Sequence, residues 1–519
     1  MSAAFLQSGL NLNRWDVLVN TRIKCKSTIP FITIPMFYLN SKPHIGHLYS
    51  AVLADSLYRW KCLRNHISFD KGIFAVGTDE HGQKVFKSCS NNVPILEHCD
   101  QVSSKFRHLF HQANISYTYF SRTTSDKHVD LVGEMWKKLT DKGFIVKGEF
   151  EGWYSEDDEC FYSPREVLKS SDSNIVTSKS SGSIVYWTKE ENYFLQIESL
   201  KSKIKDWLHA QSITDRYVPV IQKYIDTVPP TISVSRPRKR CHWGIDVPSD
   251  SSQVIYVWFD ALACYLEAAG WPDKMVKWPP DVQIVGKDII RFHSVLWTAI
   301  LLALGLELPK YIRCHGHLLN NNLKISKRLG NSSKTPDQLI SEFSCDGLRY
   351  ALIRVGALEE DVNFDDITLK RIVNSELANN LGNLLRRATS KLVNPDQLIN
   401  LESDYISWHD DVITLMDQGN LYGGLIKIYE AIRSANLKFH EHAPWKKRDD
   451  KVVSDVLNDV RKAAILMQHI TPSLSLSILE KLGLQNKSQI HHLTQSTESS
   501  VKLSQSSNDI LFPRIEIKL

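Results

Sequence analysis

The sequence has no long apolar run, no closely paired cysteines and no large excess of charge. The longest apolar run, Val295 to Leu306, falls short of the roughly 20 residues that a membrane-spanning helix needs, so it predicts a buried helix and no membrane partner. None of the nine cysteines forms a C-x-x-C pair, which argues against a zinc knuckle and suits free thiols in a reducing compartment. A net charge of +5 permits a nucleic-acid partner without requiring one.

Residues 1–29 differ in composition from the rest of the chain. They hold four basic residues against one acidic residue: Arg14, Arg22, Lys24 and Lys26 against Asp16. A basic, acid-poor and amphipathic leader is typical of an organelle transit peptide. Composition alone is equally compatible with an ordinary N-terminal tail.

The first half of the chain alternates between strand and helix patterns. Residues 31–38 and 73–76 predict apolar strands, and residues 48–63 predict the helix between them. This order is typical of a doubly wound, parallel-sheet (Rossmann-like) α/β domain. Ligands of such domains bind beyond the carboxyl ends of the strands, where helix N-termini point. Three polar residues should therefore lie there: His44, His47 and Asp79.

A different pattern interrupts this domain between residues 145 and 240, where short aromatic-rich stretches predict a β-rich region. Strand–helix alternation then returns, with predicted strands at 254–258 and 283–285 and an apolar helix that carries His293. We therefore expect one α/β domain that is split in two by an inserted domain.

Strand patterns disappear after about residue 365. Residues 374–392, 412–439 and 452–470 have the apolar spacing of helices, which predicts an α-helical bundle of roughly 100 to 120 residues. The Ser- and Gln-rich stretch 485–508 predicts a linker, and the β-like pattern of residues 510–519 predicts a segment that pairs back onto the body.

The segment Pro43-His44-Ile45-Gly46-His47 is a candidate phosphate site. A helix N-terminus offers free N–H groups and partial positive charge, and two histidines spaced i, i+3 lie on one face and can donate to a phosphoryl group. Gly46 leaves room for a nucleotide to approach the backbone. The alternative is a pair of structural histidines near a strand end.

Far downstream, Lys324-Ile325-Ser326-Lys327-Arg328 forms a second candidate. Two lysines in a loop with Ser and Gly can close over a polyphosphate and offset the charge that develops on leaving pyrophosphate. The alternative is a solvated basic loop. Both signatures on the expected halves of one α/β fold favour the phosphate interpretation.

These motifs belong to a longer set that resembles class I aminoacyl-tRNA synthetases, and among them the methionyl-tRNA synthetases. The resemblance runs from about residue 30 to the end of the helical region, too short a chain for the long editing insertion of leucyl, isoleucyl and valyl enzymes. Ten segments carry it: ITIPMFYLNSKPHIGHLYS (32–50), VGTDEHGQK (76–84), EGWYS (151–155), KEENYF (189–194), ISVSR (232–236), HWGIDVP (242–248), VIYVWFDAL (254–262), IVGKDIIRFH (284–293), KISKRLGN (324–331) and HAPW (442–445).

The resemblance implies a methionine–tRNA ligase activity. ATP with Mg²⁺ would convert methionine to methionyl-adenylate, and methionine would then pass to the 3′-terminal adenosine of tRNA(Met). The implied catalytic residues are His44, His47, Lys324 and Lys327, and the implied ATP-binding residues are Gly46, Lys287, Asp288 and Lys327. The implied methionine-binding residues are Met36, Tyr38, Asp79, Trp258, Phe292 and His293, and the implied anticodon-binding residues are Asn383, Arg387 and Trp445.

Physical arguments support several of these roles and leave alternatives open. Asp79 suits an ammonium group by charge, and aromatic faces suit a polarisable sulfur. The alternative interpretation of Trp258 is an aromatic residue of the core. The alternative for Lys287 and Asp288 is an ion pair at the surface. Trp445 is expected in an exposed loop, where it could stack an unpaired base. The alternative for Asn383 is a residue that packs between helices, and the alternative for Arg387 is an arginine exposed to solvent.

With the resemblance, the chain divides into seven expected segments. These are 1–29, a mitochondrial transit peptide; 30–144 and 241–330, the two halves of the catalytic domain; 145–240, the inserted connective domain; 331–370, a flap-containing junction; 371–484, the helical anticodon-binding domain; and 485–519, the linker and C-terminal segment.

The chain departs from the family pattern in three places. Only Cys160 and Cys241 lie in or near the insertion, so we predict no zinc. Ile325 and Arg328 replace Met and Ser of the KMSKS loop, which leaves both lysines in place. No further C-terminal domain follows the helical region. Together with the basic N-terminus, these features resemble the animal mitochondrial form, which implies a monomer in the mitochondrial matrix.

Two other functions remain open. A related class I synthetase or nucleotidyltransferase would use the same phosphate chemistry with a different substrate. A catalytically silent RNA-binding or regulatory relative is favoured only by Ile325 and Arg328, and the retained histidines and lysines argue against it.

Overall fold

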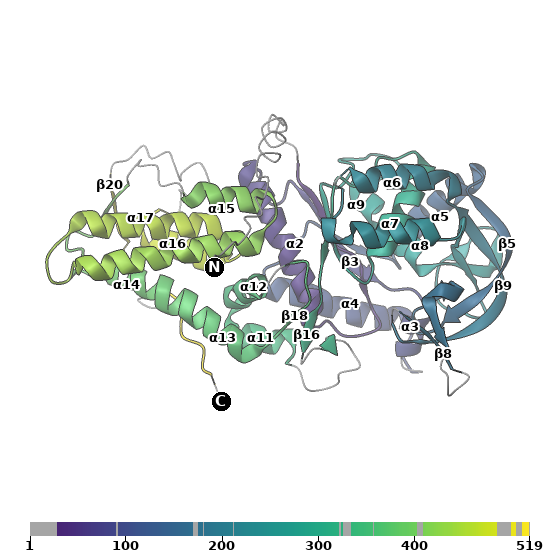
Figure 1. Cartoon of the computed structure of the whole chain (residues 1–519), viewed down its shortest axis with the longest axis horizontal. Coiled ribbons are helices and arrows are strands. Elements are labelled where there is room, and N and C mark those ends of the chain that lie inside the picture. The colour runs from purple at the N-terminus through teal and green to yellow at the C-terminus, as the bar shows by residue number, and fades with distance from the viewer. Residues whose placement is uncertain are drawn as a thin grey trace, which may run out of the picture.

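The computed structural model describes eleven stretches of the chain: residues 29–89, 92–169, 175–179, 181–210, 212–320, 323–324, 334–355, 358–401, 408–484, 500–504 and 511–517. Nearly all of the expected transit peptide, residues 1–28, lies outside them. The molecule is elongated, with an antiparallel sheet at one end, a parallel sheet in the middle and a helical bundle at the other end (Figure 1). No helix in the described stretches is both long and apolar enough to cross a bilayer.

The central sheet is parallel and confirms the expected α/β class. Its strands run in the order β15-β14-β1-β3-β2, with β4 also paired to β3. The strands are β1 (Phe31–Thr33), β2 (Phe37–Tyr38), β3 (Ile73–Asp79), β4 (Tyr119–Arg122), β14 (Val282–Gly286) and β15 (Ile312–His315). Their carboxyl ends meet at one edge, where a ligand of such a sheet would bind.

The single strand expected at residues 31–38 is broken into β1 and β2. Pro35 lies in the break and has no N–H to donate to the ladder. Pairing with β3 continues on both sides, because Ile34 N donates to the Ala75 carbonyl at 3.2 Å and Leu39 N donates to the Asp79 carbonyl at 2.9 Å. The break brings Met36 to the carboxyl edge of the sheet.

Helix α2 (Ile45–Arg64) follows directly and is longer than the predicted 48–63. His44 caps it, since its side chain accepts from Gly46 N. Most of the helix is buried, because one side packs on β1 and β14 and the other packs on helices of the second half of the chain. α2 therefore links the parallel sheet to the helical bundle.

The insertion contains an antiparallel sheet in the order β6-β5-β9-β8-β7, with β10 also paired to β9. Its strands are β5 (Ile145–Ser155), β6 (Cys160–Tyr162), β7 (Val167–Lys169), β8 (Val176–Ser178), β9 (Ile184–Gln196) and β10 (Thr231–Ser233). Helices α6 (Lys201–His209) and α7 (Val218–Thr227) follow β9. A small sheet of β11 (Ser235–Pro237), β12 (Asp246–Val247) and β13 (Asp250–Ile255) leads back to the α/β domain.

The strand predicted at 254–258 is wrong in its second half. β13 ends at Ile255, and α8 (Val257–Leu262) begins two residues later, so Trp258 lies on a helix. A short apolar run fits a buried strand and a buried helix equally well, so periodicity could not place this boundary. The apolar helix predicted around residues 295–306 is confirmed by a π-helical turn at Phe292–Trp297 followed by α10 (Thr298–Leu304).

The second half is mainly helical. Its helices are α11 (Pro336–Phe343), α12 (Cys345–Arg354), α13 (Asp366–Val373), a π-helical stretch at Asn374–Gly382, α14 (Asn383–Ala388), α15 (Trp408–Asp417), α16 (Leu421–His442), α17 (Asp450–Met467) and α18 (Pro472–Lys481). The helix predicted at 412–439 is two helices, because Gly419 adopts a positive φ of 73° and Asn420 caps α16.

Two expectations for the C-terminal part are wrong. β19 (Leu398–Asn400) pairs antiparallel with β20 (Ser500–Lys502), so strands do occur after residue 365 and part of the expected linker is ordered. The described residues 511–517 contain no strand. They dock through Phe512, which is buried, and through Ile515, whose N–H and carbonyl bond the Asn374 side chain at 2.7 and 2.8 Å.

A buried ion pair holds α2 against the helical region. Arg349 of α12 donates to Asp55 of α2 at 2.6 Å and also to the backbone carbonyls of Ala113, His469 and Ile470. Its side chain is 1% exposed and that of Asp55 is 0% exposed. Arg59 binds the same Asp55 oxygen at 2.8 Å. Removing one partner would therefore strand a charge in the core.

We expect Arg349→Met to lower the free energy of unfolding by about 3–5 kcal/mol, because it leaves the Asp55 carboxylate with one cation instead of two. Urea denaturation followed by circular dichroism measures the change. Arg448→Ala is the control, since Arg448 pairs with Asp396 and Asp450 at the surface and its loss should cost under about 1 kcal/mol. Equal effects of the two variants would contradict this role for Arg349.

Candidate active site

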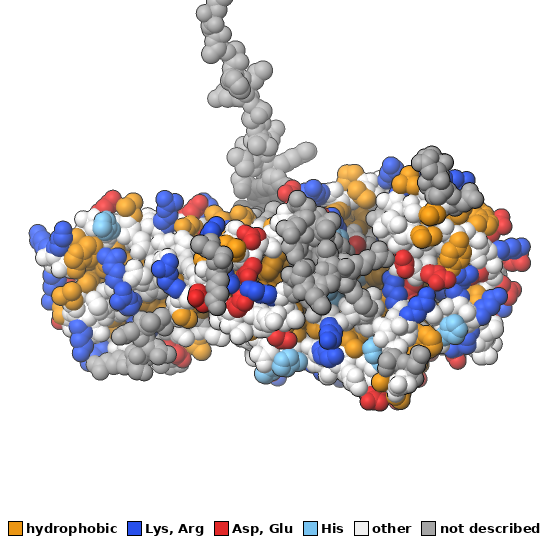
Figure 2. All heavy atoms as spheres, turned by 90° about the horizontal axis from the view of Figure 1, so that it is seen from below, with side chains coloured by type: hydrophobic (Ala, Val, Ile, Leu, Met, Phe, Trp, Pro, Cys, Tyr) orange, Lys and Arg blue, Asp and Glu red, His pale blue; other side chains and the backbone are white. Residues whose placement is uncertain are grey.

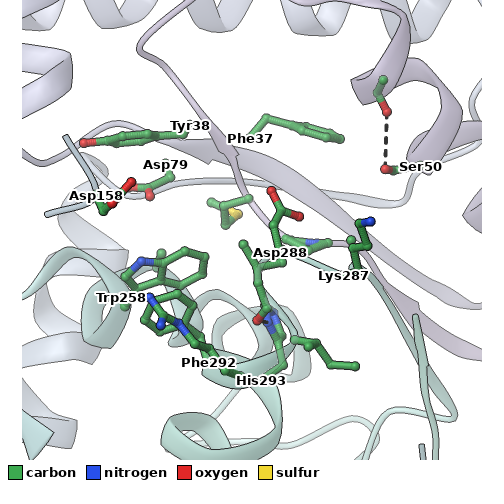
Figure 3. A pocket seen from close by; sticks show the side chains of 18 of the residues that line it. Phe37, Tyr38, Ser50, Asp79, Asp158, Trp258, Lys287, Asp288, Phe292 and His293 are labelled. Carbon is green, nitrogen blue, oxygen red and sulfur yellow. Dashed lines mark hydrogen bonds between the residues drawn. The ribbon is translucent and has the colours of Figure 1, made fainter. Parts of the chain in front are cut away.

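A cavity of about 1310 Å³ opens at the carboxyl edge of the parallel sheet. Segments far apart in the sequence line it, including the β1–β2 region, the start of α2, the end of β3, α8 and the residues after β14 (Figure 3). Eleven predicted site residues lie in its wall: Met36, Tyr38, His44, Gly46, His47, Asp79, Trp258, Lys287, Asp288, Phe292 and His293.

The two lysines of the flap motif cannot be placed in the same way. Lys327 and the Ile325 and Arg328 substitutions lie outside the described residues. The backbone of Lys324 belongs to β17 (Leu323–Lys324), which pairs with β16 (Leu318–Asn320). Leu318 of β16 lines the cavity, so the described strand that pairs with Leu323–Lys324 lies next to the site.

His44 and His47 form a stacked pair at the start of α2. Their ring centroids are 3.7 Å apart, at an interplanar angle of 22°. Nδ1 of His44 accepts from Gly46 N at 3.1 Å, and Nδ1 of His47 accepts from His44 N at 3.2 Å. Each neutral ring therefore carries its proton on Nε2, which makes that nitrogen a hydrogen-bond donor. A helix N-terminus with two such donors suits a phosphate group.

Lys287 and Asp288 follow β14 at the same end of the cavity (Figure 3). Each pairs with a residue other than its neighbour. Lys287 Nζ lies 2.6 Å from Asp361, and Asp288 lies 3.2 Å from Nε2 of His317. Asp361 directly precedes β18 (Val362–Asn363), which pairs with β16. The charged pair is thus connected to the small sheet that carries the flap.

Asp79 ends β3 at the other end of the cavity, beside Tyr38 (Figure 3). It is 8% exposed, and one of its carboxylate oxygens has no hydrogen-bond partner. Burial raises the pKa of Asp79 well above its usual value, and the nearby carboxylates of Asp260 and Glu159 raise it further. A cation bound there would relieve both effects, so the position suits an ammonium group.

Aromatic side chains enclose the space next to Asp79. Trp258 and Phe292 stack with centroids 4.0 Å apart and an interplanar angle of 6°. Tyr38 donates to Glu159 at 2.8 Å, which fixes its ring across the cavity from them. With Met36 in the wall, this end accepts an apolar or sulfur-containing side chain.

His293 is fully buried behind the aromatic pair. Burial lowers its pKa to about 4, so the ring is neutral at physiological pH. Its Nδ1 lies 3.1 Å from the Ile289 carbonyl, which can only accept. Nε2 therefore accepts from the Tyr265 hydroxyl at 2.8 Å. Tyr265 also lines the cavity, and sequence patterns gave no indication of it.

The comparisons with known proteins identify the family. A family model described as "tRNA synthetases class I (M)" matches residues 30–389. The mitochondrial methionine–tRNA ligase of Xenopus laevis is 36% identical, over 92% of this chain and 90% of that protein. The chain belongs to the class I methionyl-tRNA synthetase family. The methionine–tRNA ligase of Rickettsia felis is 37% identical, over 94% of this chain and 98% of that protein.

Solved structures agree with this family membership. Methionyl-tRNA synthetase of Mycobacterium tuberculosis bound by methionyl-adenylate superposes with a TM-score of 0.85 and 29% identity, over 94% of this chain and all of that chain. The free form of the same enzyme superposes with a TM-score of 0.79. The resemblance predicted from the sequence is confirmed, whereas the roles of individual site residues stay predictions.

The three expected anticodon residues of this synthetase fold lie together on the helical bundle. The Arg387 guanidinium sits 4.7 Å from the centre of the Trp445 ring and 4.9 Å from that of Phe439. Asn383 lies one turn earlier on α14 and accepts from Arg386 at 3.1 Å. Trp445 is half-buried rather than fully exposed as expected, because its ring also packs against Phe439 and His440.

Exposed basic side chains also flank these three residues. Four exposed cations come from segments next to the three residues: Arg386, Lys391, Lys446 and Lys447. Figure 2 shows Lys and Arg side chains over the helical end, interspersed with hydrophobic ones. Such a mixture suits a phosphate backbone beside stacked bases.

No group of three or more metal-ligating side chains occurs within the described stretches. Cys160 contacts the Arg291 guanidinium at 3.4 Å, and Cys241 donates to the Trp243 carbonyl at 3.4 Å. These two thiols therefore have other partners and do not assemble a tetrahedral site.

We predict that the purified protein contains well below one zinc ion per chain, measured by inductively coupled plasma mass spectrometry. Dialysis against a zinc chelator should leave its thermal unfolding midpoint unchanged, because Cys160 and Cys241 do not form a metal site. Stoichiometric zinc, or loss of structure on chelation, would contradict the prediction.

Proposed function

We propose that this protein is a methionine–tRNA ligase that acts in mitochondria. It activates methionine with ATP to methionyl-adenylate and pyrophosphate, and then transfers methionine to the 3′-terminal adenosine of tRNA(Met). The observation that best supports this proposal is a single cavity whose two ends differ chemically. One end has a histidine pair on a helix N-terminus, and the other has a buried carboxylate beside stacked aromatic rings. The names of the relatives and of the adenylate-bound structure support the same reaction.

In the activation step, Asp79 holds the methionine ammonium, and Trp258 and Phe292 contact the side chain. A methionine carboxylate oxygen attacks the α-phosphorus of ATP, an O–P bond forms, and the bond to pyrophosphate breaks. ATP would enter as its Mg²⁺ complex, and the ion would offset negative charge on the phosphates. His44 and His47 donate to the phosphates, as do Lys324 and Lys327 when the flap closes. Positioning and charge stabilisation therefore supply the catalysis.

The domain assignment follows from the same proposal. Residues 30–144 and 241–330 form the catalytic domain, 145–240 the connective domain, 331–370 the junction with the flap, and 371–484 the anticodon-binding domain. Asn383, Arg387 and Trp445 bind the anticodon. Residues 1–29 are the transit peptide, the mature enzyme works as a monomer in the matrix, and residues 485–519 form the C-terminal segment.

Amino-acid-dependent ATP–pyrophosphate exchange, run with each of the standard amino acids, tests the proposal. We expect stimulation by methionine, because stacked aromatic rings enclose the space beside the buried Asp79 carboxylate, one oxygen of which has no hydrogen-bond partner. Stimulation by leucine or cysteine instead would indicate another class I enzyme. Absence of exchange with every amino acid would indicate a catalytically silent relative.

Lys327→Ala should reduce methionine-dependent exchange by about 10²- to 10³-fold, because one donor to the developing charge is lost. Methionine binding, measured by isothermal titration calorimetry, should be largely kept. Lys327→Arg is the matched variant and should retain more activity, since it keeps the positive charge. If Lys327→Ala lost methionine binding as well, the flap would not act on the phosphates alone.

Trp445→Ala should leave pyrophosphate exchange unchanged and raise the KM for tRNA in the charging assay. The loss of one stacked base predicts a rise of roughly 5- to 150-fold. Leu437→Ala is the control, since Leu437 is a 58% exposed apolar residue on α16 and should affect neither assay. Equal loss of both activities in Trp445→Ala would show that the helical bundle has been misassigned.

A further inference from the structure

Four charged or titratable side chains form a buried chain behind the cavity. His81 Nδ1 lies 2.6 Å from Asp260, whose other oxygen lies 2.8 Å from Nε2 of His128. Nδ1 of His128 lies 2.9 Å from Glu267. All four are at most 5% exposed, so water does not screen these contacts.

His128 carries the positive charge in this buried chain of side chains. Each of its ring nitrogens faces a carboxylate oxygen, and a carboxylate can only accept, so both nitrogens donate and the ring is an imidazolium. Burial alone would lower the pKa of His128, but the hydrogen bonds that it donates to Asp260 and Glu267 outweigh burial and raise that pKa to about 10. The ring therefore stays protonated across the physiological pH range.

Two members of this buried chain of side chains, His81 and Asp260, lie beside the two walls of the cavity at its amino-acid end. His81 follows Asp79 by two residues, and Asp260 follows Trp258 by two residues. The His81–Asp260 contact thus joins the segment after β3 to α8. His128 on α5 (Asp126–Asp141) supports this contact from behind and is itself held by Glu267 on α9 (Cys264–Ala269).

We propose that His128 is a positioning residue for methionine: through Asp260 and His81 it fixes Asp79 and Trp258 relative to each other, and its buried positive charge offsets part of the negative charge around Asp79. The inference rests on the proposed function, in which Asp79 binds the methionine ammonium.

The groups around this chain define its charge balance. Asp79 faces Glu159 from the β5–β6 turn and Tyr38 from β2, and Lys84 Nζ lies 3.9 Å from Glu159.

Asp260 and Glu267 lie near the Cys264 thiol. Glu267 also accepts from Tyr119 at 2.8 Å and from Ser121, and Lys127 binds the Tyr119 hydroxyl at 2.8 Å. The Trp243 ring covers His81. Among these described groups, His128 is the buried cation with direct carboxylate contacts on both sides.

The test uses two charge-removing variants with opposite expected signs. His128→Gln removes the cation that favours ionised Asp79, so the acidic limb of kcat/KM for methionine should move to higher pH. Glu159→Gln removes a like charge, so the limb should move to lower pH. Pyrophosphate exchange measured from about pH 6 to about pH 9 gives both profiles.

At neutral pH, His128→Gln should raise the KM for methionine about tenfold, with kcat and the KM for ATP changed far less, because one pKa unit corresponds to a factor of ten. His469→Gln is the matched control. His469 is also a fully buried histidine, but its pKa is lowered to about 3 and it lies in the helical region, so its loss should leave the methionine KM and the pH profile unchanged.

Unshifted limbs, or limbs that move in the same direction in both variants, would overturn the inference. If His128→Gln does not fold, ¹⁵N-histidine NMR of the wild type decides. At about pH 9, where ordinary histidines are neutral, an imidazolium signal should persist, and its absence would overturn the inference. Wild-type protein without methionine-dependent exchange would instead refute the proposed function, so the two failures are distinguishable.

Discussion

The arrangement of the whole molecule depends on the double attachment of α2. Its first turn carries His44 and His47 at the cavity, and its later turns are fixed to the helical half of the chain. Asp55 binds Arg349, while Trp60 and Arg64 both donate to Asp417 at 2.8 and 3.0 Å. A helix of this length spans about 30 Å as a stiff rod. One helix therefore positions both the histidine pair and the helical bundle. A displacement of either end of α2 would disturb the buried ion pair between Asp55 and Arg349.

Carboxylates and hydrogen-bond donors are distributed unevenly along the cavity. Carboxylates gather at the amino-acid end, where Asp79, Asp260 and Glu159 lie within reach of one another. Donors gather at the other end, in the imidazoles of His44 and His47 and the ammonium of Lys287. Like charges held together out of water repel, and protonation, a cationic ligand or a buried counter-ion relieves the repulsion. A zwitterion beside a polyphosphate matches this pattern, because its ammonium and the phosphates would each meet the complementary end.

Local patterns in the sequence were sufficient for several of the elements and for the histidine pair, whereas most of the other predicted residues of the cavity wall came from the family resemblance. The α2 helix, the parallel strands and the histidine pair follow from apolar spacing and from the motif at residues 43–47. The errors have local causes as well. Pro35 interrupts a strand that its neighbours favour, and residues 254–258 fit a strand and a helix equally well.

Pairings between distant segments were beyond the sequence. β19 and β20 are about a hundred residues apart, and nothing in either short stretch specifies the other. The buried chain from His81 to Glu267 joins four segments whose members, taken singly, are ordinary polar residues. Trp445 was expected in an exposed loop, whereas its ring contacts Phe439 and Arg387 on two helices of the bundle.

The tip of the insertion, made of the strands β6, β7 and β8 and the start of β9, has a small core of its own. Among its described residues this core holds five buried side chains, and cores of this size usually need reinforcement. Arginines supply it here. Arg236 is buried with its guanidinium 4.0 Å from the centre of the Tyr256 ring, Arg240 lies 4.7 Å from that of Tyr154, and Arg291 contacts Cys160. Planar guanidinium groups stack on aromatic faces while donating from their edges, so they can join strands much as a metal would. The same contacts tie the tip to the cavity, because Arg291 precedes Phe292 and the tip residue Glu159 binds Tyr38. The insertion is thus held by interactions that also fix the aromatic end of the site.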